Sequence, residues 1–270
     1  MNLFIYIVIF LFGLIIGSFI NCLIYRLRNK KSLNGRSFCP HCKKQINWYD
    51  NIPLLSFFIL KGKCRKCKKT ISFEYPLVEL VTAITFILIY HFASLSVYTC
   101  SIVPLLTLFR NWLFASILIV IFIYDFKYYL ILDKVSIPAI ILALIVNLFI
   151  AFLNTGFNSL ISEFLNLALS AIVAGGFFFL QFAISRGKWI GGGDIRLGLL
   201  MGFMLGWPYV LPALAISYIL GSLVGMFLIG AKHANMKTQV PLGTFLAIGI
   251  FIVLIWGSQI VNWYLTFTFY

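Results

Sequence analysis

Four of the six cysteines form two pairs, and in each pair two residues separate the thiols. The pairs are Cys39-Pro-His-Cys42 and Cys64-Arg-Lys-Cys67, with residues 43–63, 21 in all, between them. This spacing is close to that of zinc ribbons, in which about 15–20 residues separate the pairs. Four thiolates on two turns can close a tetrahedron around zinc, and neighbouring Lys and Arg residues favour the deprotonated thiols. The pattern therefore predicts a structural zinc site.

Other interpretations of these cysteines remain open at this point. They are disulfides, a redox dithiol, or a loop without metal. His41 lies inside the first pair and is a competing ligand. Four thiolates would leave no open position on the metal, so a catalytic zinc is not expected. Cys22 and Cys100 lie in or beside apolar runs and are expected to be small buried hydrophobic residues.

Two of the seven acidic residues occupy positions that suit acid–base chemistry. Asp125 ends the apolar run 117–124, and Asp194 follows Gly191-Gly192-Gly193, which permits close approach of another chain. Two neighbouring carboxylates share one proton, so one activates water while the other donates to the scissile carbonyl. The pair therefore predicts aspartic-peptidase chemistry.

The alternative for these two residues is that they are ordinary acids flanking the membrane, near Lys127 and Arg196. No triad competes with the aspartate pair. The three histidines, His41, His91 and His233, are scattered, and no set of Ser, His and acid stands out.

The composition identifies the elements that must position these residues. Hydrophobic residues make up 62% of the 270 residues and charged residues only 10%. Soluble domains are about half apolar and a quarter charged, and a membrane helix needs about 20 apolar residues. We therefore predict an all-α, polytopic bundle of about eight transmembrane helices. The expected spans are 3–25, 76–96, 102–124, 136–153, 160–184, a short one at 195–206, 209–230 and 242–265.

The net charge of +14 predicts the orientation of the bundle. Thirteen of the 21 Lys and Arg residues lie in residues 26–69, and all others except Arg110 flank three further gaps. With eight spans, all four gaps fall on one side, which the positive-inside rule places in the cytoplasm. Both termini then face outward, and residues 1–25 form a retained span and not a cleaved signal. The charge is expected to set the topology alone, and contact with anionic lipid or a partner surface is the alternative. No nucleic-acid-binding fold fits the loops.

Several motifs together resemble the bacterial type IV prepilin peptidase/N-methyltransferase family. They cover essentially the whole chain in the order typical of the family. They are Gly17-Ser-Phe-Ile-Asn-Cys-Leu-Ile-Tyr-Arg26, the two cysteine pairs, Trp48-Tyr-Asp-Asn-Ile-Pro-Leu-Leu-Ser56, Tyr75-Pro-Leu-Val-Glu79, Gly191-Gly-Gly-Asp-Ile-Arg-Leu197 and Pro241-Leu-Gly-Thr-Phe-Leu-Ala247.

The resemblance implies an enzyme with two activities. It implies that Asp125 and Asp194 are the catalytic pair and that Asp133 supports its loop. Its substrates would be type IV prepilin or pseudopilin precursors, cut after a glycine that ends a basic leader, just before an apolar helix. It also implies methylation of the new N-terminal amine by S-adenosylmethionine. The sequence has no glycine-rich signature for that cofactor, and Glu79 is the one candidate residue for its site.

Three positions depart from the family pattern. Glu74 stands where Arg is usual, Leu132 where Pro is usual, and Arg196 replaces Lys. Glu74 lies in the region associated with methyl transfer, so a peptidase without methyltransferase activity is the alternative function. A transporter or scaffold with a zinc knuckle is a more distant one.

The expected domains follow from these assignments. Residues 1–25 form the first transmembrane helix, and residues 26–75 a cytoplasmic zinc-knuckle insertion associated with methyl transfer. Residues 76–270 form the membrane-embedded peptidase domain. The expected location is the bacterial cytoplasmic membrane.

Overall fold

The structure is a computed structural model that describes residues 2–93, 102–231 and 240–269. Every long element in these residues is a helix, and the chain divides into two compact units, Met1–Ala93 and Ser94–Tyr270. Cys100 and His233, and the basic residues Lys232 and Lys237, lie outside the described residues. The predictions made for these four positions are therefore not addressed below.

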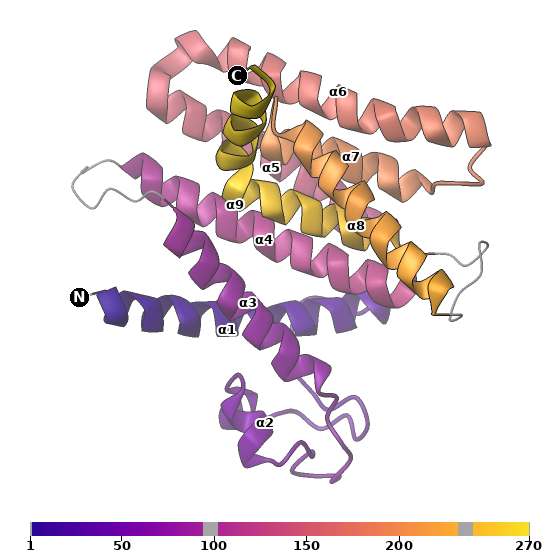
Figure 1. Cartoon of the computed structure of the whole chain (residues 1–270). Helices are drawn as coiled ribbons and strands as arrows, with labels where there is room; N and C mark the ends of the chain where they lie inside the picture. The colour runs from indigo at the N-terminus through magenta and orange to yellow at the C-terminus, as the bar shows by residue number, and fades with distance from the viewer. Residues whose placement is uncertain (1, 94–101, 232–239, 270) are drawn as a thin grey trace. The chain divides into compact units, whose positions relative to one another are not determined.

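Unit 1 consists of two long helices and the segment that connects them. The helices are α1 (Asn2–Arg28) and α3 (Glu74–Phe92), and they cross each other (Figure 1). The connection has little regular structure, with a 3₁₀ turn η1 (Trp48–Asn51) and the short helix α2 (Leu55–Ile59). Buried Arg26, near the end of α1, donates to the Gly35 carbonyl at 2.6 Å. This hydrogen bond ties the start of the connecting segment to α1.

Glycines on α1 let its backbone lie directly against α3. A Cβ atom on Gly13 would be 2.6 Å from the Ala83 Cα, and one on Gly17 would be 2.6 Å from the Glu79 Cα. Two glycines four residues apart form a typical helix-contact motif in membranes, where close backbone packing replaces the hydrophobic driving force. The contact places Ser18 and Asn21 of α1 beside the first turns of α3, and the Asn21 Nδ2 donates to the Tyr75 carbonyl at 2.9 Å.

The described residues of unit 2 form six α-helices around an apolar core. The core includes Phe114, Phe178, Leu197, Met201 and Ile250, all fully buried. The helices are α4 (Ile102–Tyr128), α5 (Asp133–Thr155), α6 (Leu160–Ser185), α7 (Gly192–Leu205), α8 (Val210–Gly230) and α9 (Leu242–Phe269). A 3₁₀ turn, η2 (Gly156–Ser159), joins α5 to α6.

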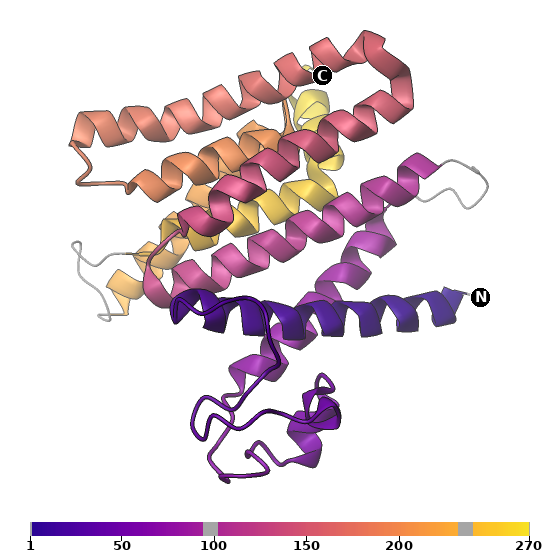
Figure 2. The same ribbon diagram turned by 180° about the vertical axis from the view of Figure 1, so that it is seen from behind.

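Small residues also set the packing inside unit 2. Helices α6 and α7 lie side by side in both views (Figures 1 and 2). A Cβ atom on Gly202 of α7 would overlap the Ala171 backbone of α6, and one on Gly198 would be 2.9 Å from the Ala174 carbonyl oxygen. This close contact fixes the position of α7 along α6.

Arg110, a basic residue inside the membrane span of α4, has polar partners. Its Nη1 donates to the Asn147 Oδ1 of α5 at 2.9 Å, and the Asn147 Nδ2 donates to the Phe203 carbonyl of α7 at 2.6 Å. A charge at this depth is tolerated when it is paired inside the bundle. These hydrogen bonds therefore connect α4, α5 and α7.

The predicted all-α membrane fold is confirmed. Seven helices of the described residues are long and apolar enough to cross a bilayer. They are all the long helices except α7, which has 14 residues and spans about 21 Å, less than the ~30 Å hydrocarbon core. The short sixth span of the prediction, 195–206, corresponds to this helix. Observed bounds differ from predicted ones by a few residues, and α4 continues past Asp125 to Tyr128.

Candidate functional site

The two cysteine pairs of unit 1 adopt the same local structure. In the first, the Cys39 N–H donates to the Lys44 carbonyl at 3.0 Å, and in the second the Cys64 N–H donates to the Lys69 carbonyl at 2.9 Å. An isolated antiparallel bridge closes each turn, Phe38 with Gln45 and Lys63 with Thr70. The residue after the second cysteine has a left-handed backbone in both, with φ of 58° at Lys43 and 59° at Lys68. The result is two equivalent knuckles.

The four thiols of the knuckles form one cluster. The Sγ atoms of Cys39, Cys42, Cys64 and Cys67 all lie within 4.8 Å of one another, and Cys39 and Cys67 are 3.9 Å apart. Tetrahedral geometry with a Zn–S distance of about 2.3 Å requires sulfur separations of about 3.8 Å. Backbone N–H groups of Cys67 and Lys66 lower the pKa of the Cys64 thiol to about 7. The cluster can therefore hold a tetrahedral metal ion.

Two of the open alternatives for the cysteines can be compared with this geometry. None of the five described cysteines is in a disulfide. His41 is not a member of the cluster and instead lines a neighbouring cavity. Cys22 lies on α1, is half-buried, and also lines that cavity.

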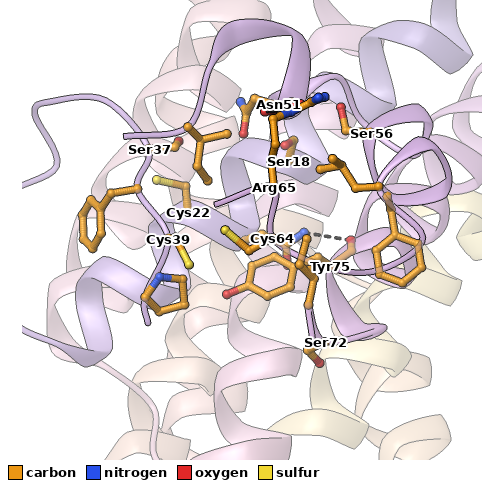
Figure 3. Close-up of a pocket in the computed structure, with 18 of the residues that line it drawn as sticks. Ser18, Cys22, Ser37, Cys39, Asn51, Ser56, Cys64, Arg65, Ser72 and Tyr75 are labelled. Atoms are coloured by element: carbon orange, nitrogen blue, oxygen red, sulfur yellow. Dashed lines mark hydrogen bonds and ion pairs between the residues drawn. The ribbon is translucent and has the colours of Figure 1, made fainter. Parts of the chain in front are cut away.

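A cavity of about 460 Å³ lies within unit 1. Figure 3 shows side chains of α1, the knuckles and the start of α3 around it, such as Cys22, Cys64 and Tyr75. Residues from every motif identified in residues 17–79 line the cavity. Its volume falls in the range of roughly 300–1,000 Å³ that is usual for cofactor pockets. Motifs that are separate in the sequence therefore meet at one concave site.

The two acids of this cavity differ in their partners. Asp50 accepts a bidentate ion pair from Arg65, with Nη2–Oδ1 at 2.7 Å and Nε–Oδ2 at 2.9 Å. Glu79 is only 8% exposed, and its Oε2 accepts the Leu54 N–H at 2.8 Å. The Ser18 side chain also hydrogen-bonds to Glu79. Within the described part of the chain, Glu79 has no cationic partner.

In unit 2, Asp125 lies in the last turn of α4 and is 5% exposed. Its Oδ2 accepts the backbone N–H of Thr244 at 2.9 Å, and Gly243 provides a second backbone hydrogen bond. Both donors belong to the first turn of α9, whose N–H groups have no partners within their own helix. The carboxylate of Asp125 is therefore held at the N-terminus of α9.

Asp194 lies in the first turn of α7, directly after the glycine run. Its Oδ2 accepts the Gly191 N–H at 3.2 Å. The next charged residue, Arg196, forms an ion pair with Asp133 at the start of α5. This pair ties the beginnings of α5 and α7 together. Asp133 is therefore beside the helix that carries Asp194.

The fold brings the two aspartates into one neighbourhood. Asp125 lies within electrostatic range of Asp194. Ile131 connects their surroundings, because its side chain lies against both Gly193 and Gly243. A Cβ atom on Gly193 would be 2.9 Å from the Ile131 Cβ, and one on Gly243 would be 3.1 Å from its Cδ1. A pair of carboxylates so placed has the components for shared-proton chemistry.

Three residues around the aspartates were not among the predicted site residues: Gly243, Thr244 and Ile131. A Cβ atom on Gly243 would be 2.8 Å from the Asp125 Oδ2, so this glycine makes room for the carboxylate. The motif Pro241–Ala247 was the available signal, because it contains both Gly243 and Thr244. Nothing in the sequence singled out Ile131.

Each of the two units matches a known protein family. Residues 11–93 match the profile described as the bacterial peptidase A24 N-terminal domain, and residues 112–226 match the type IV leader peptidase family. No solved structure gives a significant match.

Curated relatives match over nearly the full length. The chain is 31% identical to a prepilin leader peptidase/N-methyltransferase of Legionella pneumophila, over 97% of this chain and 95% of the relative. It is 32% identical to one of Bacillus subtilis, over 96% and 97%. It is 29% identical to one of Pseudomonas aeruginosa, over 95% and 92%. Similarity of this extent shows that the chain belongs to the type IV prepilin leader peptidase/N-methyltransferase family, peptidase family A24.

Proposed function

We propose that this chain cleaves the leader from type IV prepilin or pseudopilin precursors with Asp125 and Asp194, and then methylates the new N-terminus. The observation that carries the peptidase role is the convergence of these two carboxylates at the ends of three helices. The names of the relatives supply the substrate class and the second activity.

The two aspartates would act as one unit that holds a single proton. The ionised carboxylate takes a proton from water, and the hydroxide equivalent attacks the scissile carbonyl carbon. The protonated carboxyl donates to the carbonyl oxygen. When the C–N bond breaks, a proton moves to the leaving amine, and the pair returns to its starting state. The hydrogen bonds from Thr244 and Gly191 would hold each carboxylate at its place during this cycle.

The four-cysteine cluster would hold zinc as a structural ion. Its sulfur separations fit a tetrahedral site, and four thiolates leave no position for a substrate. The knuckle segment has almost no regular structure of its own, so metal binding would supply much of its folding free energy.

The methyl donor would be S-adenosylmethionine, in keeping with the N-methyltransferase activity named for the relatives. The chain is a multi-pass membrane protein of a bacterial family. We place its basic gaps and the knuckle segment in the cytoplasm, because cationic loops stay there. Residues 1–25 would be the first span, residues 26–75 the insertion and residues 76–270 the peptidase domain.

The aspartate mechanism is tested by the variants Asp125→Asn and Asp194→Asn. Asn keeps the shape of the side chain but cannot cycle a proton, so leader cleavage should fall by at least about 10²–10⁴-fold in each. The double variant should be hardly worse, since groups that act as a unit are not additive. Cleavage of a matched prepilin is measured in detergent, and zinc content checks folding.

Asp133→Asn is the matched control for these variants. It removes a carboxylate that pairs with Arg196 outside the dyad, so cleavage should fall far less. Full cleavage by the Asp194→Asn protein would refute the proposed mechanism.

A further inference from the structure

The cavity of unit 1 contains a buried carboxylate that the peptidase mechanism does not use. Glu79 lines the cavity from the second turn of α3. The other acid of the cavity, Asp50, is already neutralised by Arg65, whereas Glu79 accepts only neutral donors, Leu54 and Ser18. Burying a carboxylate costs free energy, and an oppositely charged group beside it reduces this cost. A positively charged group beside Glu79 would offset this cost.

The rest of the cavity has the chemistry of a nucleoside-type cofactor site. Aromatic rings of Tyr25, Phe38 and Tyr75 line it and can cover an adenine. Lys44 and Lys66 line it as well and can attract a carboxylate. A molecule with an adenine, a carboxylate and a sulfonium matches these features, and S-adenosylmethionine has all three.

We propose that this cavity is the chamber in which methyl transfer occurs, and that Glu79 is the catalytic base that takes the proton of the acceptor amine. The proposal rests on the N-methyltransferase part of the proposed function, and it adds the residue that performs the proton transfer. Every residue that lines the cavity belongs to unit 1.

The step balances without any further reactant. The acceptor amine arrives as an ammonium and gives one proton to the Glu79 carboxylate. The freed lone pair of the nitrogen attacks the methyl carbon of the donor. A C–N bond forms while the S–C bond breaks, and the bonding electrons go to the sulfur, which becomes a neutral thioether. The proton on Glu79 then leaves to water.

The position of Glu79 suits the amine better than the donor. Glu79 packs against Gly17 of α1 and lies one helical turn beyond Tyr75, inside the span Glu74–Phe92. The lysines, in contrast, come from the knuckles outside the spans. An amine at the start of a membrane helix would reach Glu79, and the donor would occupy the part of the cavity nearer to the knuckles.

Binding of the donor is tested with a substitution that fills the cavity. Ser37 lines the cavity, so Ser37→Trp should weaken binding of S-adenosylhomocysteine to the full chain at least tenfold in calorimetry. Ser32→Trp is the matched control in the same segment, exposed and outside the lining, and should bind as the parent chain does. Retained zinc and retained leader cleavage show that either variant is folded.

The role of Glu79 is tested with Glu79→Gln, which keeps an oxygen for the Leu54 N–H. Methyl transfer to a precleaved substrate should fall about 10²–10⁴-fold at pH 7, while binding of S-adenosylhomocysteine stays within about twofold. Without the base, the reaction depends on the neutral amine, whose pKa is about 8. Transfer by the variant should then rise about tenfold from pH 7 to pH 9. Glu163→Gln in α6 is the control carboxylate and should transfer normally.

The possible results separate the two proposals. If the parent chain binds the product and transfers methyl groups, but Ser37→Trp binds it equally well, the cavity is not the donor site. If Glu79→Gln transfers at the parental rate, Glu79 is not the base. A parent chain that cleaves leaders but neither binds the product nor transfers methyl groups would overturn the second activity of the proposed function together with this inference.

Discussion

The carboxylate of Asp125 owes its position to the helix α9, whose Thr244 lies 119 residues later in the chain. The Thr244 N–H donates to its Oδ2, and Gly243 leaves the space that this oxygen occupies. Both residues are in the first turn of α9, so the start of this helix acts as a cradle for a group on α4. The position of a catalytic group within a fraction of an ångström governs the rate of the reaction.

Gly243→Ala should therefore impair cleavage while leaving both aspartates in place. The new Cβ would lie 2.8 Å from the Asp125 Oδ2 and would displace the carboxylate by several tenths of an ångström. We expect a loss of about tenfold in the cleavage rate, since 1 Å of misplacement costs about 10²-fold. Gly225→Ala on α8, where no atom lies within 4 Å of the added Cβ, should cleave at the parental rate. Equal rates for the two variants would remove the role assigned to Gly243.

The cysteines provide a second comparison at the level of single residues. Purified protein should contain about one zinc per chain, and Cys64→Ser should lose most of it because the fourth thiolate is missing. Cys22→Ser, which changes a thiol outside the cluster, should keep the metal. Metal analysis by mass spectrometry makes the measurement. Methyl transfer should fall more than leader cleavage in Cys64→Ser, and a zinc-free parent chain would contradict the assignment.

At the scale of helices, the packing of both units depends on glycines that face another backbone. Gly13 and Gly17 serve this purpose between α1 and α3, and Gly198 and Gly202 between α7 and α6. In a bilayer the surrounding lipid is as apolar as the side chains, so the strength of a helix pair comes from close contact. These glycines therefore allow direct contact between helix backbones, which a larger apolar residue at the same position would prevent.

The variant Gly202→Ala tests this packing. Its Cβ would overlap the Ala171 backbone, so α6 and α7 must separate, and we expect a loss of about 1–3 kcal/mol of unfolding free energy. Gly176→Ala on α6 adds the same methyl group into open space and should leave the melting temperature unchanged or slightly raised. Thermal unfolding in detergent compares the two. Identical melting curves would show that the α6–α7 contact is not tight.

Sequence patterns predicted most helices well, because a bilayer demands long apolar runs. The start of α9 at Leu242 and of α6 at Leu160 agree with prediction. Helix ends that lie beyond an apolar run were harder to predict. Helix α4 continues through Asp125 to Tyr128, and the hydrogen bond between Asp125 and α9 stabilises its last turn. The cysteine cluster was also predictable, since its ligands are close in sequence and their spacing is characteristic.

The cavity of unit 1 could not be predicted from the sequence. It depends on turns in which non-glycine residues have positive φ, such as Leu54 at 58° and Lys43 at 58°. Sequence propensities disfavour these conformations, which tertiary contacts impose. The Leu54 N–H donates to Glu79, 25 residues away in the chain, and this hydrogen bond holds the turn against α3. Glu79 was predicted as a candidate for the methyl-donor site, without its partner or its surroundings.

At the scale of the whole molecule, the distribution of charge predicts the topology. Thirteen of 21 basic residues are concentrated in residues 26–69, and the positive-inside rule keeps such a segment in the cytoplasm. If the short α7 crosses the bilayer in addition to the seven long helices, we expect both termini on the opposite side.

Reporter fusions test this arrangement. A reporter fused after Lys69 should be active only as a cytoplasmic marker, and one fused after Tyr270 only as an external marker. A fusion after Ser159, between α5 and α6, serves as an internal control and should also be external. Accessibility of the fused marker in intact cells makes the measurement. An external signal at Lys69 would invert the topology and move the basic segment away from the cytoplasm.

The division of the chain has a consequence for how such a protein can evolve. The residues that line the cavity all precede Ala93, whereas Asp125, Asp194 and the residues that hold them all follow Ile102. The two sites are thus encoded by consecutive stretches of a gene that do not interleave. One recombination breakpoint between those stretches would replace one site entirely and leave every codon of the other unchanged. Under the proposed assignment of the two sites, each activity could be lost or exchanged without a change in the residues of the other.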